Sequence, residues 1–188
     1  MKTIKTKLDG VVIIVPTVFE DKRGYFYESF NGKKLNEHIG QFDIVQINQS
    51  KSKHRVLRGL HFQKPPYTQA KVVEVLNGAI LDVVVDIRTD SPTFGEHLSF
   101  VLDDVYHEHI FVPRGFAHGF VALTPDTIIQ YKVDNEYSPT HDSGIIFDDF
   151  DLKIDWEVYN PVVSDKDKLL ERFKDQSFYS KAEFQSNV

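Results

Sequence analysis

The segment from Val56 to Gln63 holds the densest set of residues that could do chemistry. Arg58 and His61 lie there among apolar side chains. A buried arginine needs an anionic partner, which the protein or a ligand can supply. In a strand, alternation turns His61 away from its apolar neighbours, and a bulge at Gly59 would bring Arg58 to the same face. Histidine titrates near neutrality and suits proton transfer, although a backbone carbonyl could also satisfy this ring.

A second histidine follows a tight-turn signal, in the spacing Pro113-x-Gly115-x-x-His118. This spacing resembles the second sequence motif of the cupin superfamily, in which a turn feeds a strand that sends a histidine into a jelly-roll barrel. Metal-binding cupins need an earlier motif with two more histidines and a glutamate. The His-x-His at His107 and His109 lies too close to the turn for that motif. We therefore expect a cupin-like pocket that has no metal.

Lys71 and Tyr131 are further candidates, each with an ordinary explanation beside the chemical one. Lys71 opens an apolar strand, where it could extend to solvent at an edge or stabilise an oxyanion inside the barrel. Tyr131 is expected on a strand next to the one that carries His118. Its phenol could serve as a general acid, or it could be a core tyrosine with its hydroxyl at the rim.

An aromatic and acidic segment near the N-terminus could bind a nucleotide. Phe26 and Glu28 alternate on one face of an expected strand, where they could hold a nucleobase by stacking and hydrogen bonding. Arg23 could bind a phosphate with its forked guanidinium. Each of these residues also has an ordinary surface explanation.

Short strands must position these groups, because runs of four to eight β-branched and aromatic residues recur between turn signals. Acidic residues at 82 and 86 frame one apolar run, as in a strand that is buried on both faces. Many short strands of this kind predict a mainly β sandwich or barrel. The expected strands are Val11–Val15, Tyr25–Phe30, Ile44–Asn48, Ala70–Leu76, Ile80–Ile87, Leu98–Leu102, His109–Val112, Ala117–Leu123 and Thr127–Asp134.

Helix signals are few and are concentrated toward the C-terminus. A short helix is expected over Lys33–Ile39. A second helix is expected to begin at Ser164, where a capping-box pattern ending at Asp167 precedes apolar residues at helical spacing. The tail after Ser177 is polar and is expected to be loose. With neither repeats nor a linker, residues 1–188 are expected to form one domain.

Composition narrows the class of protein. The chain has 188 residues, of which 41% are hydrophobic, and a net charge of −6. An acidic chain is not expected to bind nucleic acid or anionic membranes. Cysteine is absent, which excludes disulfides and thiolate catalysis. The sequence shows neither a signal peptide nor an apolar run long enough to cross a membrane, so we expect a cytoplasmic protein.

Taken in order, these segments resemble the dTDP-4-dehydrorhamnose 3,5-epimerase family from about Thr3 to Lys168. The resemblance implies a cupin-like jelly-roll subunit with short helices, in a homodimer, without metal or redox cofactor. It implies a dTDP-4-keto-6-deoxyhexose substrate that is inverted at C3 and C5. The matching stretches are Phe19–Gly24, Val45–Ser52, Val56–Gln63, Val83–Arg88, Ser91–Gly95, Pro113–Phe120, Tyr131–Lys132, Tyr137–Pro139 and Asp155–Trp156.

The resemblance also implies roles for individual residues. His61 matches the general base, Asp167 the carboxylate that orients it, and Tyr131 the general acid. Lys71 matches a residue near the keto oxygen. The matches to substrate-binding residues are Arg23 and Arg58 for the diphosphate, Phe26, Glu28, Gln46 and Asn48 for the nucleotide and sugar, and His118 and Tyr137 for the pocket.

Asp167 could instead belong to the capping box at Ser164, and both roles hold only if its carboxylate reaches His61. Four positions differ from residues common in the family and bear on the sugar pocket: Arg55, Ala70, Asp142 and Phe147. Three alternatives stay open. They are an epimerase that inverts a single carbon of another nucleotide-diphospho-4-keto sugar, a sugar-binding jelly roll without catalysis, and a metal-dependent cupin enzyme.

Overall fold

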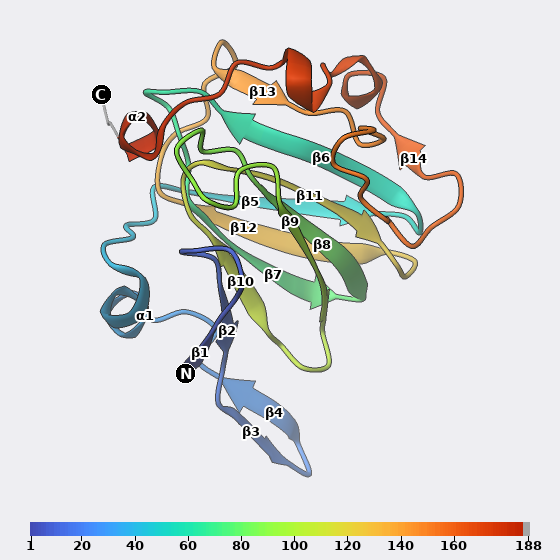
Figure 1. The fold of residues 1–188 in the computed structure, drawn as a ribbon. Helices are drawn as coiled ribbons and strands as arrows, with labels where there is room; N and C mark the ends of the chain where they lie inside the picture. Colours follow the sequence, from blue (N-terminus) through green and yellow to red (C-terminus); the bar gives the residue numbers. More distant parts are fainter. Residues whose placement is uncertain (186–188) are drawn as a thin grey trace.

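The computed structural model describes residues 1–185, whose body consists of two β-sheets packed face to face (Figure 1). This arrangement confirms the predicted mainly β sandwich. The first sheet has the order β1 (Lys2–Lys5), β2 (Val12–Val15), β10 (His109–Val112), β7 (Lys71–Asn77), β12 (Thr127–Val133), β5 (Gln46–Ser52). The second has the order β13 (Asp142–Gly144), β6 (Val56–Gln63), β11 (Phe116–Ala122), β8 (Ala79–Asp86), β9 (His97–Asp103), and β14 (Val162–Val163) pairs in parallel with β6.

A separate hairpin of two strands, β3 (Val18–Asp21) and β4 (Gly24–Tyr27), extends beyond the sheets. We call these residues, 18–27, the arm. Figure 1 shows the arm projecting past the end of β2, on the side of the molecule opposite β6. The expected strand Tyr25–Phe30 therefore ends early, at Tyr27. The other eight predicted strands are all present, with bounds shifted by up to a few residues.

Strand β8 shows how the apolar pattern builds the core. Val84 and its neighbours on one face pack between the two sheets, whereas Val83 and Val85 pack against the C-terminal segment on the other face. All three valines are fully buried, which confirms the prediction of a strand buried on both sides. Trp156, Leu152 and other apolar residues after β13 cover the outer face of the second sheet. Close packing on both faces of the second sheet restrains β8 and β11.

The helices are few, as expected, but only one of the two predicted helices forms. Helix α1 (Gly32–Ile39) is confirmed, and the side chain of Asn31 caps it by accepting from the Lys34 amide at 3.1 Å. The helix predicted from Ser164 is wrong, since only single turns form, η1 (Asp167–Leu169) and η2 (Phe173–Asp175). Leu169 is 84% exposed, so no apolar stripe holds a longer helix. No helix within residues 1–185 is long and apolar enough to cross a membrane.

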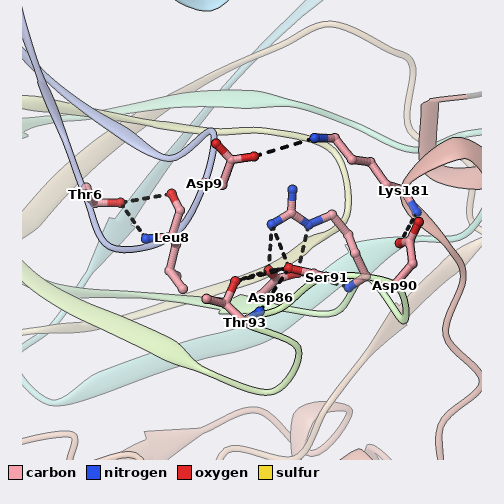
Figure 2. Close-up of polar contacts among 9 residues, drawn as sticks. Thr6, Leu8, Asp9, Asp86, Asp90, Ser91, Thr93 and Lys181 are labelled. Atoms are coloured by element: carbon pink, nitrogen blue, oxygen red, sulfur yellow. Dashed lines mark hydrogen bonds and ion pairs between the residues drawn. The ribbon is translucent and has the colours of Figure 1, made fainter.

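The C-terminal segment is anchored rather than loose as far as residue 185. Helix α2 (Lys181–Gln185) buries Phe184, and the Lys181 amide donates to Asp90 Oδ1 at 2.7 Å. The Lys181 ammonium lies 3.5 Å from Asp9, which Figure 2 shows reaching across from the N-terminal loop. The loose tail expected after Ser177 thus differs from the structure over these residues. Residues 186–188 lie outside the described part of the chain.

A buried ion pair lies beside this anchor. Arg88 Nε donates to Asp86 Oδ1 at 2.8 Å, and the hydroxyls of Ser91 and Thr93 donate to Asp86 Oδ2 at 2.6 Å each (Figure 2). The guanidinium also lies 4.4 Å from the ring centre of Phe116. A buried pair with this many hydrogen bonds fixes the turn that follows β8.

Candidate active site

A cavity of about 190 Å³ between the two sheets brings together most of the residues singled out in the sequence. The second sheet contributes Arg58 and His61 from β6 and His118 from β11, while the first sheet contributes Lys71 from β7 and Tyr131 from β12. The other lining residues are Asn48, Phe62, Gln63, Gln69, Phe120, Val133, Tyr137 and Asp142. Side chains from facing sheets can therefore approach opposite sides of one small molecule.

A bulge in β6 places Arg58 and His61 on the same side. His61 lies opposite His118 in β11, whereas Arg58 lies opposite Phe120, so β6 holds one residue more than its partner. Gly59 sits at this bulge with φ of +121°, and a Cβ there would meet Gly119 Cα at 2.6 Å. Glycine is needed at this position for both reasons, and the expected bulge is confirmed.

His61 is paired with Asp167 across 106 residues of sequence. Its Nε2 lies 2.8 Å from Asp167 Oδ1, and the Gly59 amide donates to Oδ2 at 3.3 Å. The backbone amide of Asp167 still donates to Ser164 Oγ at 3.0 Å, so half of the capping pattern is retained while the carboxylate turns to His61. Because Nε2 faces an acceptor, Nδ1 is the ring nitrogen left to take up a proton.

The carboxylate in this pair is ionised. Burial alone would raise the pKa of Asp167, but the hydrogen bonds from His61 and from the Gly59 amide lower it below its usual value. An ionised carboxylate on Nε2 holds the imidazole in one tautomer and stabilises the imidazolium once it forms. The pair therefore has the geometry of a general base with an orienting acid.

Lys71 lies at the start of β7, and its side chain lines the cavity. Burial lowers the pKa of Lys71 to about 8, against the carboxylates of Asp82 and Asp142, which favour the charged form. The ammonium is thus cationic at neutral pH but close to its titration point. A buried cation of this kind can stabilise negative charge that develops on a bound molecule.

Tyr131 lies on the other side of the cavity from His61. Strand β12 belongs to the first sheet and β11 to the second, so Tyr131 and His118 face one another across the sandwich with ring centres 6.2 Å apart. The expectation that their strands are neighbours was wrong, because the chain crosses from one sheet to the other between β11 and β12. Burial raises the pKa of the Tyr131 phenol above its usual value, so it stays protonated and can donate.

The sequence reasoning missed Asp82. This carboxylate on β8 is fully buried, and its Oδ2 lies 2.7 Å from His118 Nε2. It forms a second histidine–aspartate pair beside the first, since His118 on β11 pairs with His61 on the neighbouring strand β6. The available signal was an aspartate inside the expected strand Ile80–Ile87, where Asp82 and Asp86 were interpreted only as the frame of an apolar run.

Polar residues surround the mouth of the cavity. Gln46 Nε2 donates to Asn48 Oδ1 at 2.7 Å, and the Tyr137 hydroxyl donates to Asp142 at 3.1 Å. Arg58 Nε donates to Ser52 Oγ at 3.1 Å and Nη2 to the Lys51 carbonyl at 3.5 Å, and the remaining N–H groups of the guanidinium could meet an anion. Gln46 does not itself line the cavity, although its Oε1 accepts from the Tyr137 amide at 3.4 Å.

Three predicted residues, Arg23, Phe26 and Glu28, are not brought to the cavity of their own chain. Arg23 and Phe26 lie on the arm, where Arg23 pairs with Asp21 and Phe26 is 70% exposed. Glu28 follows the arm and pairs with Lys34 at 2.7 Å. A substrate that contacts both this cavity and these residues would need the arm of another copy of the chain.

No other groove or side-chain cluster considered within residues 1–185 is as good a candidate for the active site as this cavity. A larger groove of about 620 Å³ lies beside α1 and the N-terminal loop, and none of the candidate residues lines it. Its Arg114 already pairs with Asp134 at 3.0 Å. Among residues 1–185, no group of three or more histidine, aspartate or glutamate side chains is arranged to hold a metal ion.

Comparison with known proteins shows which family this chain is similar to. A family model described as dTDP-4-dehydrorhamnose 3,5-epimerase matches residues 5–175. An enzyme of that name from Shigella flexneri is 43% identical over 95% of this chain and 99% of its own length. The crystal structure of one from Elizabethkingia anophelis is 46% identical, with a TM-score of 0.91 over 95% of this chain and 99% of that one.

A third relative was solved with a ligand. It is the dTDP-6-deoxy-D-glucose-3,5-epimerase of Legionella pneumophila, in complex with dTDP-4-keto-L-rhamnose. It is 38% identical, with a TM-score of 0.91 over 95% of this chain and 97% of that chain.

Proposed function

The chain belongs to the dTDP-4-dehydrorhamnose 3,5-epimerase family, and we propose that His61 and Tyr131 carry its proton transfers from facing sheets of the sandwich. The protein is an isomerase with a cupin-like jelly-roll fold. It inverts C3 and C5 of a dTDP-4-keto-6-deoxyhexose, and so converts dTDP-4-dehydro-6-deoxy-glucose to dTDP-4-dehydro-rhamnose. The observation that carries the proposed roles is a base and an acid on opposite sides of one cavity.

The first step is removal of a proton from a carbon next to the ketone. His61 Nδ1 takes the proton, and the electron pair of the C–H bond moves toward the carbonyl to give an enolate. Asp167 Oδ1, at 2.8 Å from Nε2, stabilises the imidazolium that results. The ketone itself makes these hydrogens acidic, so the reaction needs neither a metal nor a redox cofactor.

The enolate places negative charge on the former carbonyl oxygen, and the cavity offers a cation for it. Lys71 is that cation, whereas His118, whose Nε2 is held by Asp82, lies on the facing sheet. Charge stabilisation in a water-poor cavity is worth far more than the same contact in water. Tyr131 then gives its proton to the opposite face of the carbon, which inverts the centre. His61 then releases its proton to water and Tyr131 regains one, after which the same cycle at the second carbon completes the reaction.

We propose a homodimer in which the arm of one chain completes the nucleotide end of the other chain's site. Phe19, Tyr25 and Phe26 are all more than half exposed on the arm, and apolar side chains exposed in this way mark an interaction surface. A stacked aromatic contributes about 1–3 kcal/mol to binding a base. We expect the enzyme to work in the cytoplasm, where nucleotide sugars are made.

The function is tested by incubating the protein with dTDP-4-keto-6-deoxyglucose in heavy water and following the sugar by proton NMR and mass. Deuterium should enter at both C3 and C5, and His61→Ala should abolish entry at both carbons. Entry at one carbon alone would identify a single-site epimerase. No entry with a folded protein would contradict the proposed substrate.

The arm is tested by subunit complementation. Alone, His61→Ala should be inactive and Phe26→Ala weakly active. Co-expression should restore roughly a quarter of wild-type activity, because half of random dimers are mixed and each has one intact site of two. Recovery requires that the intact arm of the His61→Ala chain serves the partner's cavity. If the mixture is no more active than its parents, the arm serves its own chain or none.

A further inference from the structure

Three polar residues meet at the sugar end of the cavity and are only partly used by the mechanism. The carboxylate of Asp142 accepts from the Tyr137 hydroxyl and forms an ion pair with the ammonium of Lys166. The side chain of Asp142 is 13% exposed and lines the cavity, as does Tyr137. Lys166 approaches from a distant part of the chain and lies directly before Asp167 in sequence. The ion pair therefore joins the cavity wall to the segment that supplies the orienting carboxylate.

The two ends of this ion pair have well-defined places in the fold. Asp142 begins β13, whose Gly144 lies opposite His61 in β6. Lys166 lies directly before the turn η1, which begins with Asp167. The pair thus connects the segment of Asp167 to β13, whereas the 2.8 Å contact between His61 and Asp167 connects it to the neighbouring strand β6.

The segment that carries Asp167 has few other restraints. Its turn is only three residues long, and Leu169 within it is exposed, so no apolar side chain of the turn anchors it. Leu170 packs closely on Gly144 at the far end, and the Glu171 carbonyl accepts from the Ile146 amide at 2.9 Å. Among the described residues, the hydrogen bonds and ion pairs that join residues 165–169 to the rest of the protein are those of Asp167 and Lys166. The amides of Lys168, Leu169 and Leu170 donate only within the segment.

We propose that Lys166 and Asp142 form a latch that positions Asp167 against His61 and, through Tyr137, closes the sugar end of the cavity. Lys166 and Asp142 are positioning residues in this scheme, since they act on the reaction through Asp167 and Tyr137. The catalytic consequence rests on the proposed function, whereas the structural one does not. The hydrogen bond to Asp142 also raises the pKa of Lys166, so the latch stays charged at neutral pH.

The chain offers a matched control two residues away. Lys168 is as exposed as Lys166, but its ammonium pairs with Asp165 at 3.0 Å, within the same turn. Lys168 therefore has the same charge and neighbourhood as Lys166 without the connection to β13. Lys166→Met and Lys168→Met remove equal charge, and only the first removes the latch.

The structural claim is tested in the free protein by amide hydrogen exchange. An exposed ion pair contributes little, so Lys166→Met should speed exchange of the amides of residues 164–170 by about two- to fivefold, with Lys168→Met unchanged. Lys166→Arg should restore slow exchange because it keeps the cation. Equal exchange in all four proteins would overturn the latch, whatever the substrate proves to be.

The catalytic claim is tested by turnover of the 4-keto sugar by the same variants. Lys166→Met should lower kcat about tenfold and shift the acidic limb of the pH profile, since misplacement of the orienting carboxylate weakens the base. A rise in KM alone, with exchange unchanged in the free protein, would mean that Lys166 touches the substrate and would refute the latch. Wild-type protein that is inactive on this sugar would contradict the proposed function, while the exchange measurement still decides the latch.

Discussion

Replacing Asp167 with asparagine should remove most of the turnover and leave the fold in place. In the native protein its two oxygens accept from His61 Nε2 at 2.8 Å and from the Gly59 amide at 3.3 Å. Asparagine has a single acceptor oxygen, so its NH₂ group must face one of these two donors. If it faces His61, the ring carries its proton on Nδ1 and can no longer act as the base. The same change of tautomer costs about 10⁴ in kcat in a serine protease triad.

The loss of charge can be bounded from the geometry. A hydrogen bond to a charged group contributes about 1.5–3 kcal/mol. The full Coulomb interaction at 2.8 Å is about 6 kcal/mol at an effective dielectric constant of about 20. Because the His61 side chain is 36% exposed, screening by water favours the lower part of this range. A loss of about 3–4 kcal/mol corresponds to a kcat reduced by roughly 10²–10³.

The assay is deuterium entry into the 4-keto sugar in heavy water, with thermal unfolding as the check on folding. Asp165→Asn is the control, because Asp165 is almost fully exposed two residues away and pairs only with Lys168. It should retain wild-type turnover. If Asp167→Asn also stayed within about threefold of wild type, the carboxylate would be a structural acceptor for the Gly59 amide and not part of the base.

Further expectations concern the acid, the cation and the bulge. In Tyr131→Phe, deuterium should enter the sugar faster than the inverted product forms, since His61 can still remove and return a proton on one face. If NMR shows that deuterium entry and inversion are lost equally, Tyr131 is a binding contact. The pKa of Lys71 is about 8, so its cation is present below that pH and is lost as pH rises through it. In pH–rate profiles, kcat/KM should therefore fall above about pH 8, and Lys71→Arg should move that limb to higher pH; an unmoved limb would assign it to another group. Gly59→Ala should lower the free energy of unfolding by at least about 2 kcal/mol more than Gly24→Ala does. Both glycines have φ near +120°, but only at Gly59 would a Cβ meet other atoms. If urea unfolding gave the same loss of stability for both variants, the packing argument would be refuted.

Local patterns predicted the strands because each strand is buried in a regular way. The run around Val83 and Val84 is apolar on both faces, and the fold covers both faces. The pairing of His61 with Asp167 could not be derived in this way, since 106 residues separate them and nothing local marks Asp167 as a partner. The resemblance to the family supplied that residue, and the distance of 2.8 Å supports the assignment.

The wrong helix at Ser164 has a specific physical cause. A capping pattern predicts a helix start when its polar side chains serve the helix, and here the Asp167 carboxylate serves His61 instead. Arg55 has φ of +68°, a left-handed backbone conformation that favours glycine.

Buried charges divide into two kinds by how fully they are satisfied. Asp86 and Arg88 satisfy one another and two hydroxyls, and nothing in that cluster remains for a ligand. Within residues 1–185, Asp82 Oδ1 is buried without a hydrogen-bond partner, and Lys71, whose pKa is lowered by burial, lines the cavity that His118 also lines. An unsatisfied buried polar group costs free energy that folding alone does not recover. The sequence shows all four residues as charges within apolar runs. Only their partners in the structure distinguish Asp86 and Arg88, which stabilise the fold, from Asp82 and Lys71, which lie beside the cavity.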